Sequence, residues 1–264
     1  MARTPDGPPP PPTVQRVRIR YAKRGRLRFT SHRDFQRSFE RALRRAQVPV
    51  AFSAGFSPHP RVSYANAAPT AVASEAEYLE VGLSRVCELQ ALHDALDASL
   101  PTGFDIIEVV AAGSGSLADR LEASLWRIEL PGIARSDAQA SVDSFLGLSE
   151  VPVERMTKNG IRRFDAREAV VSLAVMPDDG PRESASSEVR RDCAILQLVV
   201  RHTTPAVRPD DVLTGLRTTS GLAPFEPPRV TRLAQGPLDP RSATIGDPFD
   251  PDRSASADTI TPRG

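Results

Sequence analysis

The order in which strand-like and helix-like patterns follow one another constrains the fold of this chain more than any other feature. Between residues 14 and 235, apolar residues alternate with polar ones in some segments and recur at helical spacing in others. The first half of this region has the order strand, helix, strand, strand, helix, strand. The second half repeats it approximately, with one additional strand in its central part. The predicted segments are residues 14–21, 31–47, 48–52, 77–83, 88–100 and 104–110 in the first half, and 125–130, 136–146, 151–158, 163–175, 193–202, 209–216 and 228–233 in the second.

Local signals support this division. Ser31 is a favourable N-cap, and Asp34 three residues later can complete a capping interaction. Asn159-Gly160 is typical of a tight hairpin turn. The repeated element order is that of the split βαβ arrangement. We therefore expect an α+β protein built from two tandem ferredoxin-like (βαββαβ) domains with disordered termini.

Segments of biased composition set the domain boundaries. Five prolines follow Gly7, which predicts a solvated polyproline stretch, and Gly113 to Ser116 has the composition of a linker. The last residues are rich in Pro, Asp, Ser, Thr and Arg with little apolar content, which predicts disorder. The predicted organisation is a disordered Pro-rich leader at 1–13, a basic domain at 14–112, a linker at 113–124, a second domain at 125–235 and a disordered tail at 236–264.

Composition excludes several classes of protein. Cys87 and Cys193 are far apart, so they cannot supply the closely spaced thiolates of an iron–sulfur cluster or a zinc site. We expect no cofactor and no metal bound by this chain itself. No apolar run of about 18 residues is present, and the first residues lack the apolar core of a signal peptide. The expected location is therefore the cytoplasm.

Positive charge is concentrated in one part of the chain. Between Val14 and Arg61 there are thirteen Lys or Arg and two acids, a local charge of +11 in a protein whose formal charge is +1. The remainder must therefore sum to −10. A compact basic region beside an acidic remainder is typical of a polyanion-binding surface. The alternative is a solvated surface, or one paired with the acidic remainder.

Two arginine rows organise this basic region. Arg37, Arg41 and Arg44 share one helix face because they follow i, i+4, i+7 spacing. Arginines also occupy every second position from Arg16 to Arg20, which places them on one side of the first strand. The candidate nucleic-acid-binding residues are Lys23, Arg24, Arg26, Arg28, Arg37, Arg41, Arg44 and Arg45.

Two histidines are weak candidates for catalysis or recognition. His32 follows the predicted N-cap, where the helix dipole lowers the pKa of an imidazole. His59 lies between two prolines in a stiff loop that Gly55 opens and Arg61 closes, and these three residues form a candidate substrate loop. The structural alternatives are a capping-region histidine and a simple turn. The sequence does not show whether His32 and His59 converge.

Three runs carry a resemblance to a known family. They are residues 25–34 (GRLRFTSHRD), 39–46 (FERALRRA) and 55–65 (GFSPHPRVSYA), together with 74–79 (SEAEYL). They resemble the uncharacterised bacterial radical-SAM-linked protein family over roughly residues 14–235. In many bacteria that domain is fused to the C-terminus of a radical SAM protein. The resemblance implies a separate radical SAM enzyme as partner, which would hold the iron–sulfur cluster and SAM.

We therefore expect a non-catalytic accessory protein that binds tRNA or rRNA through its basic N-terminal face and presents it to that enzyme. One alternative is a metal-independent RNA-processing enzyme that uses His32 or His59 as general acid or base. Another is a scaffold that docks on an acidic partner protein without binding RNA.

Overall fold

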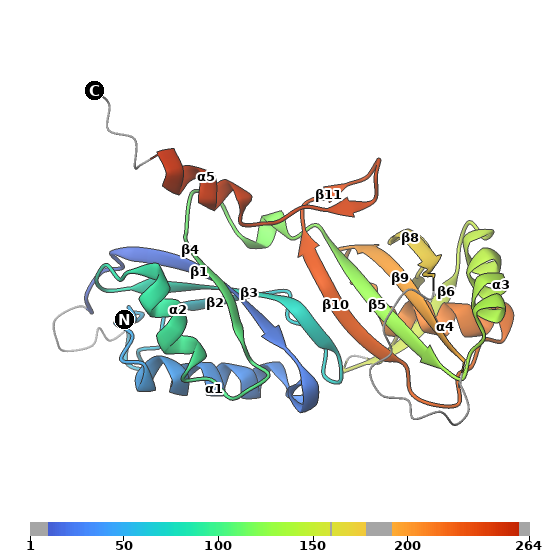
Figure 1. The fold of residues 1–264 in the computed structure, drawn as a ribbon, viewed down its shortest axis with the longest axis horizontal. Helices are drawn as coiled ribbons and strands as arrows, with labels where there is room; N and C mark the ends of the chain where they lie inside the picture. Colours follow the sequence, from blue (N-terminus) through green and yellow to red (C-terminus); the bar gives the residue numbers. More distant parts are fainter. Residues whose placement is uncertain (1–9, 159, 178–191, 259–264) are drawn as a thin grey trace. The chain divides into compact units, whose positions relative to one another are not determined.

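The computed structural model describes residues 10–158, 160–177 and 192–258, which divide into two compact units (Figure 1). Unit 1 comprises the described residues up to Arg120 together with those from Pro248 onward, and unit 2 runs from Leu121 to Asp247. Each unit combines helices with an antiparallel sheet, so the predicted α+β class is confirmed. Residues 1–9 of the predicted leader, Asn159 of the predicted turn and the end of the predicted tail lie outside the described residues.

The sheet of unit 1 has the strand order β4-β1-β3-β2, and each neighbouring pair is antiparallel. Two helices follow β1 and β3 in the chain. The elements of unit 1 are β1 (Gln15–Lys23), the 3₁₀ turn η1 (Gly25–Phe29), α1 (His32–Arg45), β2 (Val62–Ala65), β3 (Ala73–Leu83), α2 (Leu89–Asp97), β4 (Ile106–Ala111), the 3₁₀ turn η2 (Ala118–Arg120) and α5 (Asp250–Asp258).

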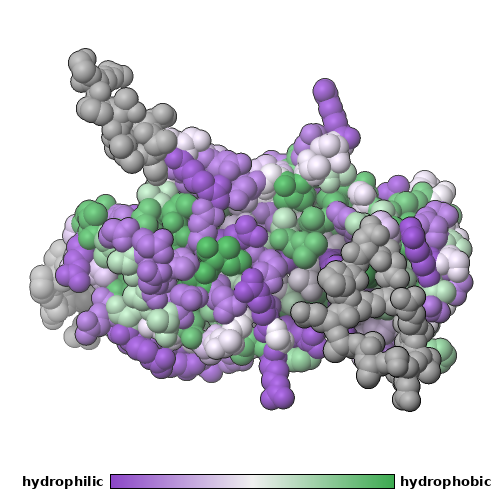
Figure 2. All heavy atoms as spheres, in the orientation of Figure 1, coloured by the Kyte–Doolittle hydropathy of each residue, from purple (hydrophilic) through white to green (hydrophobic). Residues whose placement is uncertain are grey.

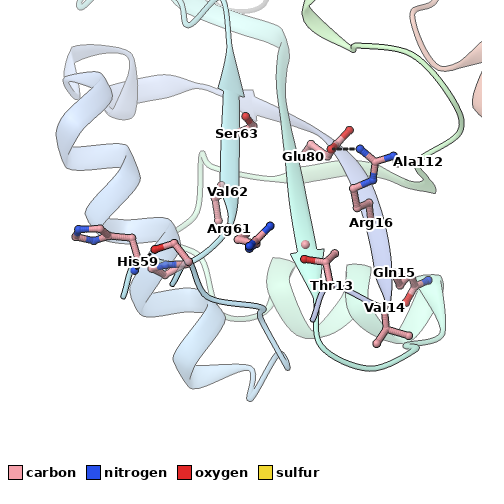
Figure 3. A pocket seen from close by; sticks show the side chains of 13 residues that line it. Thr13, Val14, Gln15, Arg16, His59, Arg61, Val62, Ser63, Glu80 and Ala112 are labelled. Carbon is pink, nitrogen blue, oxygen red and sulfur yellow. Dashed lines mark hydrogen bonds and ion pairs between the residues drawn. The ribbon is translucent and has the colours of Figure 1, made fainter. Parts of the chain in front are cut away.

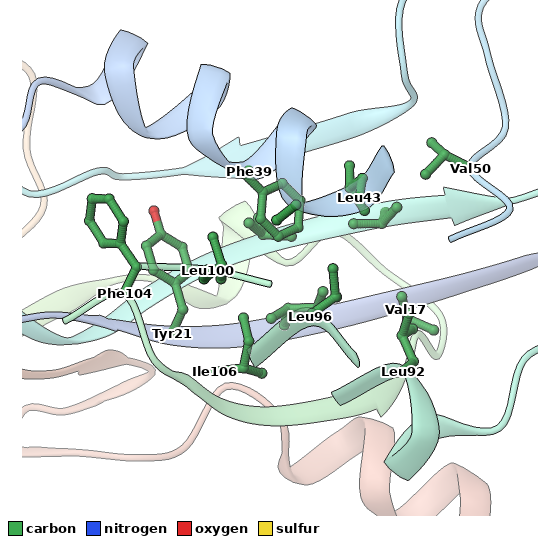
Figure 4. Close-up of a cluster of buried hydrophobic side chains, with 14 of the residues drawn as sticks. Val17, Tyr21, Phe39, Leu43, Val50, Leu92, Leu96, Leu100, Phe104 and Ile106 are labelled. Carbon is green, nitrogen blue, oxygen red and sulfur yellow. The ribbon is translucent and has the colours of Figure 1, made fainter. Parts of the chain in front are cut away.

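The main core of unit 1 lies between the sheet and the helices α1 and α2 (Figure 4). From β1, Val17 and Ile19 are fully buried there, as the alternating pattern predicts. Phe39 of α1 and Leu96 of α2 are also fully buried, at the helical spacing expected of an amphipathic helix. Burying each such side chain contributes about 1.5–3 kcal/mol, so this cluster fixes the helices against one face of the sheet.

Helix α5 covers part of the other face of this sheet, which corrects the prediction of a disordered tail over 236–264 as far as residue 258. Phe249, fully buried just before α5, packs edge-on against Tyr78 of β3 with ring centroids 5.2 Å apart. Arg253 of α5 donates to Glu108 of β4 at 2.6 Å. A single phenylalanine and a few ion pairs hold this segment on the sheet. Its low apolar content therefore did not reveal that it is folded. Figure 1 shows α5 and α1 on opposite sides of the sheet.

Two further predictions in unit 1 need correction. The predicted strand at 48–52 forms only isolated bridges, Val50 with Leu83 and Phe52 with Pro60, and the sheet gains β2 instead. The predicted linker at 113–124 is folded: its middle forms η2 and its end enters the first strand of unit 2. Asp252 of α5 accepts a hydrogen bond from the Gly113 amide at 2.9 Å, and Arg18 of β1 donates to the Gly115 carbonyl at 2.5 Å, so both elements hold the start of this segment.

The strands of unit 2 pair in the order β10-β5-β9-β8, and each neighbouring pair is antiparallel. The predicted long strand at 163–175 is divided in two, because one part closes a separate hairpin and the other joins the sheet. The elements are β5 (Ala123–Pro131), α3 (Arg135–Leu146), the hairpin of β6 (Pro152–Thr157) and β7 (Gly160–Asp165), β8 (Val170–Val175), β9 (Cys193–Arg201), α4 (Pro209–Ser220), β10 (Arg229–Gly236), and the short pair β11 (Leu238–Asp239) and β12 (Thr244–Ile245).

None of the helices that the structure describes has the length and apolar character needed to cross a membrane.

Candidate nucleic-acid interface

Helix α1 presents one of the two predicted arginine rows to solvent. Ser31 is its N-cap, as predicted, and its Oγ accepts a hydrogen bond from the Asp34 amide at 3.2 Å. The apolar side of the helix is buried in the core, so Arg37, Arg41 and Arg44 lie on the exposed side. In Figure 2, hydrophilic residues line the lower border of unit 1, where Figure 1 places α1.

The exposed row on α1 carries little compensating charge. Within the described parts of the chain, no hydrogen bond or ion pair engages the guanidinium of Arg41 or Arg44. Arg37 lies 3.8 Å from Asp34, but both side chains are 59% exposed, and such surface pairs contribute about 0–1 kcal/mol. The row therefore keeps most of its positive charge available to a polyanion.

The other candidate residues are less available, and Lys23 is a correction. Its side chain is buried, lines one small cavity with Tyr21 and Phe35 next to the start of α1, and donates to the Pro69 carbonyl at 3.1 Å. The sequence placed Lys23 at the end of a charged turn, but the strand continues to this residue and α1 covers it. Lys23 is therefore not a surface contact for nucleic acid.

Arg24 is exposed but tied to two carboxylates. It forms an ion pair with Glu75 and another with Asp105 at 2.7 Å, and the hydrogen bond that it donates to Glu75 is the main cause of its raised pKa. Arg45 donates to the Ser99 carbonyl at 3.2 Å. The Arg28 guanidinium lies 4.7 Å from the centre of the exposed Phe29 ring, a cation–π contact. Arg26 is exposed on the same 3₁₀ turn.

The second arginine row, on β1, is largely neutralised. Arg18 is completely buried, donates to Glu80 at 3.0 Å and to both oxygens of Asp252 at 2.7 and 2.9 Å. Arg120 also donates to Asp252, at 2.9 Å. Burial by itself raises the pKa of Asp252, but the hydrogen bonds from Arg18 and Arg120 hold it below its usual value. This charged cluster fixes α5 on the sheet.

His32 is the first residue of α1, and its side chain lines a small cavity in which it is partly shielded from solvent. Its Nε2 is 3.0 Å from Nε2 of Gln36, and its ring packs edge-on against Tyr64 at 5.1 Å. Partial burial is the main cause of its lowered pKa, with a smaller contribution from Lys23. The predicted direction of the shift is confirmed, and its main cause is burial. The same burial raises the pKa of Tyr64.

His59 lies at the rim of a surface pocket of about 650 Å³ (Figure 3). Its amide donates to the Ser53 Oγ at 3.0 Å, and its carbonyl accepts from the Ser53 amide at 2.9 Å, so the loop is closed at both ends. Gly55 has φ +130°, a conformation that favours glycine. Arg61 lines the same pocket, which therefore brings two of the three candidate loop residues together.

His32 and His59 line different cavities, and no contact between them is present among the residues described. Each would have to act alone in any acid–base role. The sequence did not predict that Glu80 pairs with the β1 arginines, nor that Asp252 takes part in the charged cluster, because it placed those arginines on an open face and the tail in solvent. In the described part of the chain, no three His, Cys, Asp or Glu side chains gather in a way that could hold a metal ion.

Comparison with known proteins places the chain in a family. The sequence profile of a family described as "uncharacterized protein conserved in bacteria" (DUF2344) matches residues 16–209. This range includes α1, most residues of the pocket and most of unit 2. No match is found among curated proteins. Because the profile covers well over half of the chain, this protein belongs to that family of uncharacterised bacterial proteins.

Proposed function

We propose that this protein binds RNA through the exposed arginine row of α1 and acts as an accessory partner of a radical SAM enzyme. One observation carries the RNA-binding part: Arg41 and Arg44 are exposed on one helix face, and within the described residues nothing engages their guanidinium groups. Like charges at this spacing repel one another, and a phosphate backbone relieves that repulsion with release of counterions.

The choice of partner rests on the resemblance of residues 25–34, 39–46 and 55–65 to the radical-SAM-linked family. In this proposal the partner holds the iron–sulfur cluster and SAM, and this chain supplies the RNA. The α1 row positions the RNA backbone, because phosphate contacts orient a nucleic acid without reading its sequence. Arg26 and the stacked pair Arg28–Phe29 extend the same surface at the start of the helix.

We also infer that both units are ferredoxin-like. In unit 1 the order β4-β1-β3-β2 places the first strand next to the last and the third next to the second. Unit 2 repeats this pattern if β8 is taken as its second strand and the β6–β7 hairpin as an insertion before it. In this assignment the two halves of the chain, one basic and one not, follow each other in tandem and share one architecture.

The test is binding of total cellular RNA at low salt by the full-length protein and by the Arg37→Glu/Arg41→Glu/Arg44→Glu variant. We expect the variant to lose at least roughly tenfold in affinity, because three phosphate contacts become repulsive. The matched control reverses three exposed arginines of unit 2, Arg135→Glu/Arg162→Glu/Arg217→Glu, with the same total charge change. The control should retain affinity, and circular dichroism should show both variants folded.

Absence of RNA binding by the wild-type protein at low salt would overturn the RNA part of the proposal. Affinity purification from the protein's own cells tests the partner. Recovery of a radical SAM protein together with RNA is the expected result. A radical SAM protein recovered without RNA would make the α1 row a docking surface for an acidic protein, and recovery of RNA alone would remove the partner from the proposal.

A further inference from the structure

We infer that the pocket lined by Arg16, His59 and Arg61 binds a nucleoside monophosphate, whose phosphate is held by the two guanidinium groups. The pocket lies on the sheet face that carries Arg16 and Glu80, whereas α1 packs on the opposite face. The inference goes beyond the proposed function, because it uses none of the α1 arginines and does not require them to bind RNA.

The charge balance around the pocket leaves a positive surplus. Asp252 is saturated by Arg18 and Arg120, and the Oε2 atom of Glu80 is engaged by Arg18 at 3.0 Å. Arg16 has only a long contact of 3.4 Å to the other Glu80 oxygen, and its side chain is 55% exposed. Three guanidinium groups therefore share two carboxylates, and the surplus charge falls on Arg16 at the pocket wall.

Arg61 adds a second positive group without a carboxylate. Its Nε donates to the Phe52 carbonyl at 3.2 Å, and it forms no ion pair within the described residues. This bond uses the Nε atom and leaves the two terminal nitrogens of the guanidinium for a ligand. Paired terminal nitrogens match the oxygens of a phosphate, and such charge-assisted bonds are stronger than neutral ones. Figure 3 shows the two side chains among the residues that line the pocket, with Arg16 on β1 directed toward Glu80 and Arg61 just before β2.

The backbone holds this hollow open. Gly82 of β3 lies between Arg16 of β1 and Arg61, which directly precedes β2, and a Cβ atom there would approach the side chains of Thr13 and Arg61 to 3.1 and 3.3 Å. Main-chain bonds of 2.8 Å join Gly82 to Arg61 and to Ala51, so the floor is rigid. The volume of about 650 Å³ is within the range of roughly 300–1,000 Å³ that is typical of small-molecule sites.

Two exposed aromatic residues in the loop that supplies Ser53, His59 and Arg61 to the pocket wall suit a nucleoside rather than a bare anion. Phe52, whose carbonyl accepts from Arg61, is 41% exposed, and Phe56 in the same loop is 70% exposed. Exposed aromatic side chains beside cationic groups are the usual platforms for stacking a base. The Ser63 hydroxyl, exposed on the pocket wall, adds a further polar group for the sugar or phosphate.

The test is a calorimetric titration of the full chain with adenosine 5′-monophosphate, with adenosine and inorganic phosphate as reference probes. We expect a Kd below about 1 mM for the monophosphate, and no measurable binding of adenosine. Arg61→Ala and Arg16→Ala should each weaken binding by about tenfold, the usual effect of losing a charge-assisted bond. Arg37→Ala, on the opposite side of the sheet, is the matched control and should leave the affinity unchanged.

Two further arms complete the test. Arg61→Lys keeps the charge but removes the paired nitrogens, so an affinity between those of wild type and Arg61→Ala supports the inference. A short RNA with a 5′-phosphate that binds more tightly than its 5′-hydroxyl form identifies the ligand as an RNA end, and equal binding identifies it as a free nucleotide.

Three results would overturn the inference: no binding at about 1 mM monophosphate, equal binding of adenosine, or unchanged affinity in both alanine variants. Because the α1 triple variant should still bind the monophosphate, failure of the RNA proposal remains distinguishable.

Discussion

Unit 1 carries one row of arginines on β1, from Arg16 to Arg20, and another on α1, from Arg37 to Arg44. Both rows are regular, and both lie in the basic part of the chain. In the β1 row, the middle member, Arg18, is fully buried and pairs with carboxylates of β3 and α5, and Arg16 is in longer contact with the same β3 carboxylate. The α1 row faces solvent. Arginine therefore stabilises the fold where carboxylates lie next to it, and it is available for binding a ligand where they do not.

The largest expected effect comes from removing the acidic partner of the β1 row. Asp252→Ala leaves Arg18 and Arg120 without their shared carboxylate in a buried site. Loss of one partner of a buried ion pair costs about 3–5 kcal/mol, so the free energy of unfolding of unit 1 should fall by that amount. Hydrogen exchange of the β1 amides measures it, because the only tryptophan, Trp126, lies in unit 2 and reports on that unit instead.

The matched control is Asp250→Ala in the same helix. Asp250 also pairs with an arginine, Arg253, but its side chain is 71% exposed. The expected loss is below about 1 kcal/mol. An equal loss in the two variants would mean that the β1 row does not depend on buried pairing.

The second prediction uses acid pH to remove the same partner. Asp252 has a lowered pKa in the folded protein, so its stabilising effect is present above the usual value of 3.8 and is lost as the pH falls through the folded pKa. The stabilities of the wild type and of Asp252→Asn should therefore differ at neutral pH and converge below pH 3.8. Urea titrations at a series of pH values measure both curves. A constant difference down to the lowest pH would show that Asp252 does not act through its charge.

The third prediction removes a carboxylate next to the β1 row, so that this row becomes more like the exposed row on α1. Glu80→Gln removes the carboxylate that Arg18 and Arg16 share, which should lower the free energy of unfolding by about 1–3 kcal/mol. The same change leaves Arg16 without the Glu80 carboxylate, so binding of inorganic phosphate should become stronger. Glu168→Gln, at an exposed position of unit 2, is the control for loss of one negative charge and should change neither quantity.

The smallest effect is expected at the start of α1. Ser31→Ala removes the N-cap bond to the Asp34 amide, which should destabilise unit 1 by about 1 kcal/mol. Since the arginines of α1 are distant from this bond along the helix, RNA affinity well below the melting temperature should not change. Ser38→Ala, in the middle of the same helix, is the control and should change stability by less than about 0.5 kcal/mol.

The sequence pattern predicted the elements whose periodicity is set by a core. The alternation of Val17, Ile19 and Tyr21 and the N-cap at Ser31 were correct, because each depends on neighbours in the chain. The position of α5 could not be predicted, since it depends on Phe249 and Asp252 meeting β3 and β1, more than 150 residues earlier in the chain. The same distant contacts decide which arginine row is neutralised.

The candidate site was predictable only in part. The spacing of the α1 row followed from helical periodicity, and Gly55 and the prolines around His59 indicated a stiff loop. The pocket wall could not be predicted, because it combines Arg16 and Glu80 from strands that are adjacent only in the folded sheet. Lys23 was assigned to the surface because the end of β1 beneath α1 was not evident from its charged neighbours.

The most direct measurement of the difference between the two rows is the salt dependence of RNA binding. The observed binding constant for a single-stranded oligouridylate would be measured over a range of salt concentrations for the wild type, Arg37→Gln/Arg41→Gln/Arg44→Gln, and the control Arg135→Gln/Arg162→Gln/Arg217→Gln. Loss of three phosphate contacts should lower the slope of log K against log salt by about 2, and the control should match the wild type. Equal slopes for the wild type and the α1 variant would contradict the assignment of the α1 row as the RNA-binding surface.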